Sequence, residues 1–434
     1  MTDLTSRRDF LKTSGIVVPS IAIPAFNIIK NKQGLDDIQV GLIGCNGMGW
    51  ANLQSMLRNG EIQVRAICDV DKNVLTKRVA ECRENLSYEP TQYSDYRQLL
   101  ADPQIDVVII GTPDHWHCKI MVDACVAGKD VYVEKPIANS IEECRIMEKA
   151  VSLHNRVVQV GQWQRSGPHF KDAIDFVWSG ELGNIRLVKT WAYQGWMKAI
   201  PPKPDEPVPE GVDYKMWLGP APARAFNPNR FHFNFRWYWD YAGGLMTDWG
   251  VHLVDIALWG MKAKVPKTVY AAGGKLAYPN DASETPDTLQ AIYEYEGFNM
   301  IWEHGTGIDS ANFGRNHGIA FIGNNGTLVV DRAGWEVIPE KGKMDAVNLK
   351  ERTGSDLDRH IKNFLDAVRS RNVSLLNGPI EVGSTAAVNC HMGNVAFKSD
   401  QKIHWNFSKQ AFTDKKANKL IRAQYHNHWD LPNI

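Results

Sequence analysis

Short apolar runs alternate with segments of helical periodicity in the part of the chain that follows residue 36. The runs are nearly continuous, which is typical of strands buried on both faces of a sheet. They occupy residues 38–43, 64–68, 106–110, 131–133 and 157–160. Apolar residues at helical spacing occupy residues 50–57, 73–83, 117–127 and 141–153. Strands and helices that alternate in this way predict an α/β fold with a parallel, doubly wound sheet.

Beyond residue 161, strand patterns follow one another and end in two long helical patterns. Strands are predicted at residues 185–193, 267–271, 287–295, 299–302, 319–322 and 327–331. Helices are predicted at residues 356–370 and 384–397, whereas residues 198–211 hold five prolines and predict a loop. We therefore divide the chain into a signal and linker (1–36), a first domain (37–161) and a second α/β domain (162–434).

The first residues resemble an export signal. Residues 6–12 read SRRDFLK, and the apolar stretch at residues 16–29 follows them. This stretch is short of the roughly 20 residues that span a bilayer, and Pro19 and Pro24 interrupt it. The pattern resembles a twin-arginine signal, which predicts export of the folded protein to the periplasm by the twin-arginine machinery, without stable membrane insertion after processing. The alternative is a chance arginine pair before a buried segment.

Composition narrows the classes of partner. The 434 residues carry 49 Lys+Arg and 49 Asp+Glu, so no net field attracts nucleic acid or acidic lipid, and neither is an expected partner. Seven cysteines, none in a C-x-x-C pair, argue against a disulfide scaffold and a zinc ribbon. His115 and His117 lack a carboxylate or cysteine at diagnostic spacing, so no metal site is predicted.

A glycine-rich turn with the sequence GCNGMG joins the first strand to the first helix. Such a turn lets the backbone approach a pyrophosphate, which the unpaired N–H groups at the helix N-terminus then bind. The motif departs from G-x-G-x-x-G at Asn46, although Asn tolerates positive φ better than most residues. The residues predicted to bind a dinucleotide here are Gly44, Asn46, Gly47, Met48 and Gly49.

Asp69 ends the second strand, 25 residues after Gly44. A carboxylate at this place accepts hydrogen bonds from the adenosine ribose and repels a 2′-phosphate, so NAD is favoured over NADP. The alternative is a solvated turn residue. Further residues after strand ends complete the predicted cofactor set: Thr112, Pro113, His117, Glu134 and Lys135.

Four segments in this order resemble signatures of the glucose–fructose oxidoreductase / inositol dehydrogenase (Gfo/Idh/MocA) family. They are GCNGMG at 44–49, GTPDHWH at 111–117, EKP at 134–136 and GGLMTDWGVHLVD at 243–255. The resemblance covers about residues 38–430, and residues 412–429 resemble the ending of its secreted bacterial branch. It implies a Rossmann domain followed by an α/β domain with an open, largely antiparallel sheet. The second sheet would carry helices on one face and meet a second subunit with the other, so a homo-oligomer is expected.

The last signature places Asp248 and His252 four residues apart, on one face of a predicted helix. A carboxylate beside an imidazole fixes its tautomer and raises its pKa, which suits a general base. Asp255 offers further support, and Lys135 is positioned to donate to a substrate hydroxyl. The resemblance implies that Lys135, Asp248 and His252 are the catalytic set. For Asp248 and His252, the alternative is a surface ion pair or a core histidine.

Aromatic residues gather at residues 231–241, just before this helix. Their rings suit the C–H faces of a sugar, although most are expected in the core or at a subunit interface. Substrate contacts are predicted for Trp163, Arg165, Arg236 and Tyr238, with packing between domains as the alternative for the first two.

The sequence thus predicts an exported NAD-dependent oxidoreductase that acts on a sugar, glycoside or polyol and holds its cofactor tightly. A second hypothesis is a glycoside hydrolase that uses bound NAD transiently: oxidation, elimination, addition of water and return of the hydride. A third is a nucleotide-binding protein without enzymatic activity. The sequence does not separate the first two.

Overall fold

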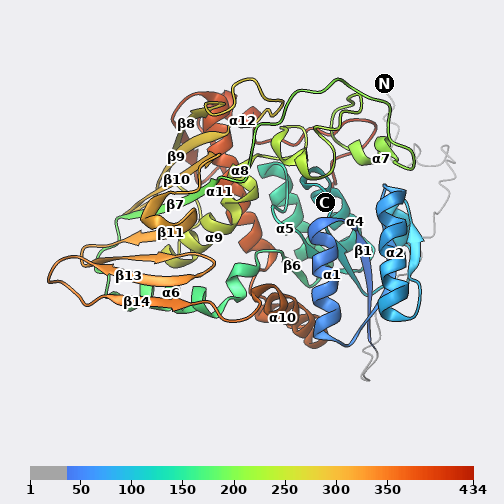
Figure 1. Cartoon of the computed structure of the whole chain (residues 1–434), viewed down its shortest axis with the longest axis horizontal. Helices are drawn as coiled ribbons and strands as arrows, with labels where there is room; N and C mark the ends of the chain where they lie inside the picture. The colour runs from blue at the N-terminus through green and yellow to red at the C-terminus, as the bar shows by residue number, and fades with distance from the viewer. Residues whose placement is uncertain (1–36) are drawn as a thin grey trace, which may run out of the picture. The chain divides into compact units, whose positions relative to one another are not determined.

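The computed structural model describes residues 37–434, so the predicted export signal at residues 1–36 lies outside the described residues. Parallel strands form a first sheet in the order β3-β2-β1-β4-β5-β6 (Figure 1). Their bounds are β1 Ile38–Ile43, β2 Ile62–Cys68, β3 Thr91–Tyr93, β4 Val107–Ile110, β5 Asp130–Val133 and β6 Val158–Val160. The central strands are apolar and buried throughout, and the predicted doubly wound sheet is confirmed.

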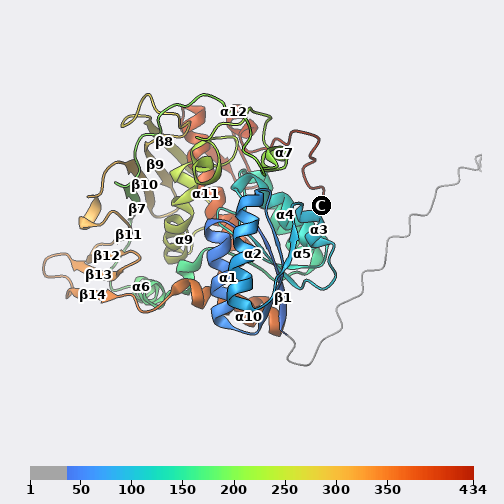
Figure 2. The same cartoon turned by 45° about the vertical axis from the view of Figure 1, so that its right-hand side comes forward.

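Helices cover both faces of the first sheet. One face packs on α3 (Tyr96–Leu100), α4 (Asp114–Val126) and α5 (Ile141–His154). The other packs on α1 (Gly47–Asn59), α2 (Lys72–Leu86) and α10 (Asp356–Ser370), which lies beside α1 in Figure 2. The sequence placed residues 356–370 in the second domain, but Phe364 of α10 packs on Tyr132 of β5, with ring centroids 5.8 Å apart.

A second sheet has the strand order β14-β13-β12-β11-β7-β10-β9-β8-β15-β16. The strands are β7 Leu187–Gln194, β8 Thr268–Gly274, β9 Thr288–Glu294, β10 Asn299–Thr306, β11 His317–Ile322, β12 Gly326–Val330, β13 Gly334–Pro339, β14 Val347–Glu351, β15 Ile403–Asn406 and β16 Ala411–Phe412. Within this sheet, as far as residues 37–434 show it, β7 and β10 form the one parallel pair and the other neighbouring strands are antiparallel. The expected open, largely antiparallel sheet is therefore confirmed.

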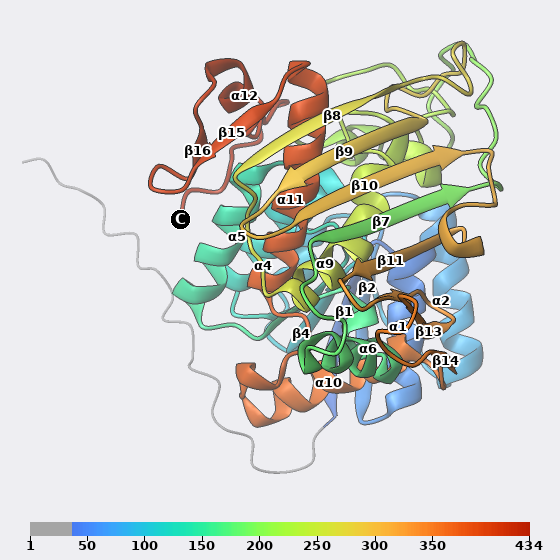
Figure 3. The same cartoon turned by 90° about the vertical axis from the view of Figure 1, so that its left-hand side faces the viewer.

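The two faces of the second sheet differ. Helices α6 (Pro168–Ser179), α9 (Gly250–Met261) and α11 (Ile380–Ser399) pack on one face. The other face is turned toward the viewer in Figure 3. Alternate residues of β9 are buried and exposed, and the side chains of Ile292 and Tyr270 are 46% and 48% exposed on the open face.

A long excursion, residues 195–244, leaves the second sheet after β7 and returns before α8 (Leu245–Asp248). It carries α7 (Tyr214–Leu218) and the 3-10 turn η2 (His232–Trp237), and in Figure 1 it crosses the top of the view toward α2. It contacts the turn after β2, where the N–H of Lys72 donates to Gly211 O at 2.9 Å and that of Asp213 to Val70 O at 2.9 Å. One segment therefore links the second sheet to the first.

Several elements are absent from the sequence prediction. They include β3, α3, α6, α7, β13, β14, β15, β16 and α12. The β14 side chains are almost all exposed, so the strand has no apolar pattern. The long helices agree better: residues 356–370 form α10 as predicted. None of the helices in residues 37–434 has the length and apolar character needed to cross a membrane.

Candidate active site

The glycine-rich turn has the geometry of a phosphate-binding turn. Gly44 and Gly47 adopt positive φ, +84° and +45°, which glycine accepts without strain. Asn46 has extended backbone instead, and its side chain accepts a hydrogen bond from the Gly47 N–H at 3.0 Å as the N-cap of α1. The turn therefore forms without a positive φ at Asn46, which the sequence pattern had allowed for, because Gly44 and Gly47 carry the left-handed conformations.

Close backbone packing holds this turn against the end of β4. A Cβ atom on Gly49 would collide with the Gly44 carbonyl oxygen, and one on Gly111 would collide with Gly49. A Cβ on Gly47, by contrast, would meet no atom within 4 Å. Asn46 and Gly47 are exposed and Met48 is half-buried. The outer side of the turn is thus open beside the N–H groups of α1, which fits a bound pyrophosphate.

Asp69 is half-buried and tied to this turn. One carboxylate oxygen accepts from the Cys45 N–H at 2.8 Å and the other from the Asp71 N–H at 3.0 Å. Burial raises the pKa of Asp69, against the effect of these two hydrogen bonds. A fixed carboxylate beside the glycine-rich turn agrees better with a ribose acceptor than with a solvated turn residue.

The histidines after β4 lie in a helix and not in a loop. His115 and His117 are in the first turn of α4, which follows Thr112 and Pro113. The ring nitrogens of His117 lie 2.7 Å from the carbonyl oxygens of Pro136 and Thr112. Burial lowers the pKa of both histidines to about 4. These carbonyl contacts hold the His117 ring against the segments that follow β4 and β5, and its place in the cofactor site stays a prediction.

Buried polar groups lie at the carboxyl ends of β4 and β5, beside α1. The Oγ1 of Thr112 has no hydrogen-bond partner in the described part of the chain. Glu134, which follows β5, accepts from Asn52 Nδ2 of α1 at 2.8 Å and from the Lys135 N–H at 3.1 Å. The unpaired Thr112 hydroxyl and the open glycine turn are the features of this structure that fit a dinucleotide.

A buried ion pair joins Lys135, at the end of β5, to Asp248, at the end of α8. Lys135 Nζ lies 2.8 Å from Asp248 Oδ1 and 3.0 Å from the Asp248 carbonyl oxygen, and Arg236 Nε donates to the same Oδ1 at 3.1 Å. Burial alone would raise the pKa of Asp248, but Lys135 and Arg236 outweigh it and hold the pKa well below its usual range. The carboxylate is therefore ionised.

His252 lies in the first turn of α9 and is buried, whereas Asp248 ends the short helix α8, so the prediction that one helix carries both residues was wrong. The Nδ1 of His252 has no hydrogen-bond partner within residues 37–434. Burial, followed by the charges of Lys135 and Arg332, lowers its pKa well below the usual value, although Asp248 opposes this shift. Asp248 does raise the pKa of His252, but burial and the two cations outweigh it, so the expected net rise was wrong. No hydrogen bond joins the two side chains in the described part of the chain, so the carboxylate does not fix the imidazole tautomer there.

Sequence reasoning missed Arg332, which follows β12 and stacks between two tryptophans. Its guanidinium carbon lies 4.6 Å from the ring centroid of Trp163 and 4.5 Å from that of Trp249. The Trp163 ring lies 5.7 Å from that of His252. Burial lowers the pKa of Arg332 to about 10. No local motif marks this arginine, because its role depends on rings from distant segments.

Asp114, also missed, sits in the first turn of α4 and is fully buried. Burial raises its pKa to about 8, even though Arg236 and Lys135 act in the opposite direction. At neutral pH its carboxyl group is mainly protonated, so it adds little negative charge to the cluster.

The four predicted substrate residues separate into two pairs. Trp163 and Arg236 lie at the cluster, as described above. Arg165 forms a two-pronged ion pair with Asp255 at 2.8 Å and stacks on Trp259, so these contacts lie within the second domain and its substrate contact stays a prediction. Asp255 therefore supports Arg165 and not His252. Tyr238 is buried in an aromatic core, where burial raises its pKa to about 12.

The site can accept a proton beside a fixed cation. The neutral imidazole of His252 and the ammonium group of Lys135 lie at the carboxyl edge of the first sheet, as does the open glycine-rich turn. No cluster of three or more His, Cys, Asp or Glu side chains suited to a metal ion occurs among residues 37–434, and all seven cysteines are free and buried.

Two family models match the chain. Residues 38–162 match the model described as "Oxidoreductase family, NAD-binding Rossmann fold". Residues 188–431 match the model described as "Oxidoreductase family, C-terminal alpha/beta domain". The second match alone covers more than half of the chain.

Similar proteins include oxidoreductases and a glycosyl hydrolase. The uncharacterized oxidoreductase YrbE of Bacillus subtilis (strain 168) is 27% identical over 301 residues, 68% of this chain and 74% of that protein. A glycosyl hydrolase family 109 protein of Shewanella baltica (strain OS185) is 31% identical over 160 residues, 32% of this chain and 35% of that protein. A solved levoglucosan dehydrogenase, in complex with NADH and levoglucosan, has a TM-score of 0.64 at 19% identity and covers 85% of this chain and 99% of its own. That likeness establishes a shared fold.

We predict that His252 stays neutral in mildly acidic solution, because burial and two nearby cations oppose its protonation. In an NMR spectrum of the histidine-labelled protein, the imidazole signal that His252→Gln removes should keep its neutral shift from about pH 7.5 to about pH 6. The unfolded chain takes up this proton more readily, so His252 also makes the free energy of unfolding fall as the pH drops below about 6.5. A midpoint near 6.5 in the folded protein would contradict the prediction.

Proposed function

Because the chain belongs to the Gfo/Idh/MocA oxidoreductase family, with an NAD-binding Rossmann domain and the family's C-terminal domain, we propose that it oxidises a carbinol carbon of a sugar, glycoside or polyol. The observation that carries the proposal is the Lys135–Asp248 pair beside a neutral, buried His252. The solved relative that binds NADH and levoglucosan agrees with this class of substrate.

The described residues fit NAD at the end of the first sheet. The open turn at Gly47 would hold the pyrophosphate, Asp69 the adenosine ribose, and the unpaired Thr112 hydroxyl the inner part of the cofactor. Bound NAD supplies a hydride acceptor at nicotinamide C4.

The protein itself handles the hydroxyl proton. The neutral imidazole of His252 accepts that proton while the carbon-bound hydrogen leaves as hydride and the carbon–oxygen bond becomes a carbonyl. Lys135 Nζ donates a hydrogen bond to the same oxygen and stabilises its developing negative charge. Asp248 holds the Lys135 ammonium in place through two contacts, at 2.8 and 3.0 Å. Two of the three N–H groups of the Lys135 ammonium bind Asp248, so the third is free for the substrate. Arg236 donates to the same Asp248 oxygen.

The turnover test uses Lys135→Met and His252→Ala. Each variant loses one proton-handling group, so kcat on an accepted substrate should fall at least ~100-fold. Bound NAD, measured after denaturation, should change little, because neither residue holds the pyrophosphate or the adenosine ribose. Lys119→Met, which removes a lysine paired with Asp123 on α4, is the matched control and should retain activity. Unchanged turnover in His252→Ala would remove the imidazole from the mechanism.

Cofactor preference rests on Asp69. Its charge repels a 2′-phosphate, so we predict that Asp69→Ala lowers the dissociation constant of NADP relative to that of NAD. Asp69→Asn keeps an acceptor for the Cys45 N–H but loses the charge, and thus separates repulsion from turn geometry. Both constants can be measured by titration calorimetry. An unchanged ratio in both variants would show that another residue discriminates.

Export and tight cofactor binding belong together in this proposal. The SRRDFLK segment supports export of the folded chain to the periplasm, where free NAD is expected to be scarce. Residues 211–213 of the excursion are tied to the turn that follows Asp69, which supports slow release of the adenosine end. We predict about one NAD per chain in protein purified without added cofactor. An empty protein that needs millimolar NAD would contradict this prediction.

Transient use of NAD to hydrolyse a glycoside is the second candidate, which the similarity to a glycosyl hydrolase family 109 protein favours. In that reaction the hydride returns to the same sugar after elimination and water addition. Incubation of a glycoside with the purified protein and no added cofactor distinguishes the two. Catalytic release of free sugar supports hydrolysis, whereas an oxidised product that forms only with an added electron acceptor supports net oxidation.

Self-association through the open face of the second sheet completes the proposal. The side chains of Tyr270 and Ile292 are 48% and 46% exposed there, and such a face is stabilised when covered. We predict a sedimentation mass that is a multiple of 48.9 kDa at micromolar concentration. Ile292→Asp should lower it toward that of a single chain, whereas Leu153→Asp, at an exposed leucine on α5, should not. A wild-type mass of one chain would overturn the proposal.

A further inference from the structure

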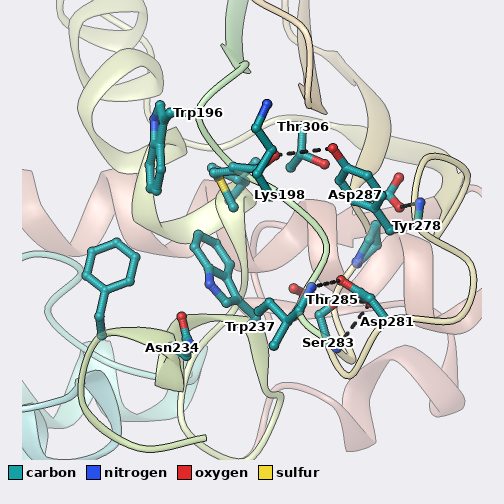
Figure 4. Close-up of a pocket in the computed structure, with 15 residues that line it drawn as sticks. Trp196, Lys198, Asn234, Trp237, Tyr278, Asp281, Ser283, Thr285, Asp287 and Thr306 are labelled. Carbon is teal, nitrogen blue, oxygen red and sulfur yellow. Dashed lines mark hydrogen bonds between the residues drawn. The ribbon is translucent and has the colours of Figure 1, made fainter. Parts of the chain in front are cut away.

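A separate cavity lies beside the catalytic cluster, in the second half of the chain. Its volume is about 210 Å³, and it is lined by the excursion, by the start of α8, by the end of β10 and by the segment between β8 and β9 (Figure 4). We call it the Trp196 cavity, after the tryptophan on its wall. Its other principal wall residues are Phe233, Asn234, Trp237, Thr285 and Thr306. None of these belongs to the predicted site.

The Trp196 cavity adjoins the catalytic cluster through shared residues. Leu245, which lines it, begins α8, the helix that ends at Asp248. Phe233 also lines it, and the Arg236 guanidinium lies 4.7 Å from the Phe233 ring centroid while donating to Asp248. The Trp196 cavity and the catalytic cluster are therefore neighbours, with the Phe233 ring between the cavity and Arg236.

Aromatic rings with exposed faces form one wall. The side chains of Trp196 and Phe233 are 57% and 53% exposed, and their ring centroids lie 6.0 Å apart with planes at 65°. The Trp196 indole N–H donates to Gln194 Oε1 at 2.6 Å, which fixes the ring. Rigid, exposed aromatic rings at the rim of a cavity suit the C–H faces of a sugar ring.

An unpaired hydroxyl marks the opposite wall. Thr306 is only 6% exposed, and its Oγ1 has no hydrogen-bond partner among residues 37–434. A buried hydroxyl without a partner is unfavourable, so a ligand hydroxyl that completes this bond would be favoured at this wall. Thr306 lies across the cavity from Asn234 in Figure 4, and both line it.

The charged groups of the cavity are already engaged. The Asp287 carboxylate accepts from the backbone N–H groups of Ala277 and Tyr278, and Asp281 pairs with Lys275. Lys198 Nζ donates to the Gly195 carbonyl oxygen at 3.0 Å. The formal charges of Asp281, Asp287, Lys198 and Lys275 sum to zero, so a neutral ligand with hydroxyl groups fits best. The volume is below the ~300–1,000 Å³ of sites for drug-sized ligands, which limits the occupant to about one ring.

We propose that the Trp196 cavity is a subsite for a second, neutral pyranose ring, joined by a glycosidic bond to the ring that reacts at Lys135 and Asp248. The preferred substrates are then disaccharides or longer glycans and not single sugars. The inference rests on the proposed function for the reacting ring, but the subsite binds its ring whether or not the neighbouring ring is oxidised.

Paired ligands test the subsite. Cellobiose, lactose and maltose are each compared with the methyl glycoside of the same non-reducing sugar, by calorimetry on the NAD-containing protein and by kcat/KM. We expect at least one disaccharide to exceed its methyl glycoside about 10-fold in both measurements, mainly through KM. Trp196→Ala should abolish this gain, and Thr306→Val, which removes only the hydroxyl, should reduce it about 5-fold. Phe407→Ala, at an aromatic side chain that is 56% exposed elsewhere, should change nothing.

Each outcome decides between the two proposals. If no disaccharide exceeds its methyl glycoside, the subsite is wrong, even where turnover of methyl glycosides upholds the oxidoreductase. A Trp196-dependent gain in binding without any oxidation upholds the subsite and counts against the proposed function. If phenyl β-glucoside gains as much as cellobiose and Thr306→Val has no effect, the occupant is an apolar aglycone and the second sugar ring is wrong. The subsite is also wrong if Trp196→Ala lowers the affinity for a disaccharide and for its methyl glycoside by the same factor.

Discussion

The buried carboxylate of Asp248 is the group on which the arrangement of this site depends. A buried charge is tolerated only when it is paired, and removal of one partner leaves the other uncompensated at a cost of about 3–5 kcal/mol. Lys135 reaches Asp248 from the end of β5 in the first sheet, whereas Arg236 reaches it from the excursion that leaves the second sheet. The pairing therefore fixes three distant segments at one point. It places the ammonium group at the carboxyl end of a parallel strand, where ligands of such sheets bind.

The same charges decide the state of His252. Lys135 and Arg332 lower its pKa in addition to burial, so the imidazole is neutral but a weak base in the resting site. A weak base removes a hydroxyl proton efficiently only if the alcohol becomes more acidic, and a hydrogen bond from Lys135 to the substrate oxygen has that effect. In the proposed reaction, Lys135 therefore makes the hydroxyl proton more acidic and the neutral His252 ring accepts it. Asp248 supports both steps because it holds the Lys135 ammonium in place.

Local sequence patterns predicted the elements well where burial is local, and failed where distant partners decide. The apolar runs specify the parallel strands, because both faces of each strand are covered, and residues 356–370 form α10 as predicted. Periodicity does not reveal that α10 returns to Tyr132 on the first sheet. The spacing of Asp248 and His252 correctly suggests neighbours, but Lys135, 113 residues from Asp248, determines how the carboxylate is used. Arg332 has no motif at all, since only the fold brings Trp163 and Trp249 around it.

The excursion at residues 195–244 contacts the proposed cofactor site, the Asp248 cluster and the Trp196 cavity. Its middle part is hydrogen-bonded to the turn after Asp69, its later part supplies Arg236 to the catalytic carboxylate, and Trp196 and Phe233 form a wall of the neighbouring cavity. The segment is held by its own aromatic core, which includes Trp217 and Tyr241. Because one packed segment meets all three places, a substitution that changes the cavity without disturbing that core can alter substrate choice alone. A substitution in the core, by contrast, will disturb the adenosine side and the catalytic cluster together.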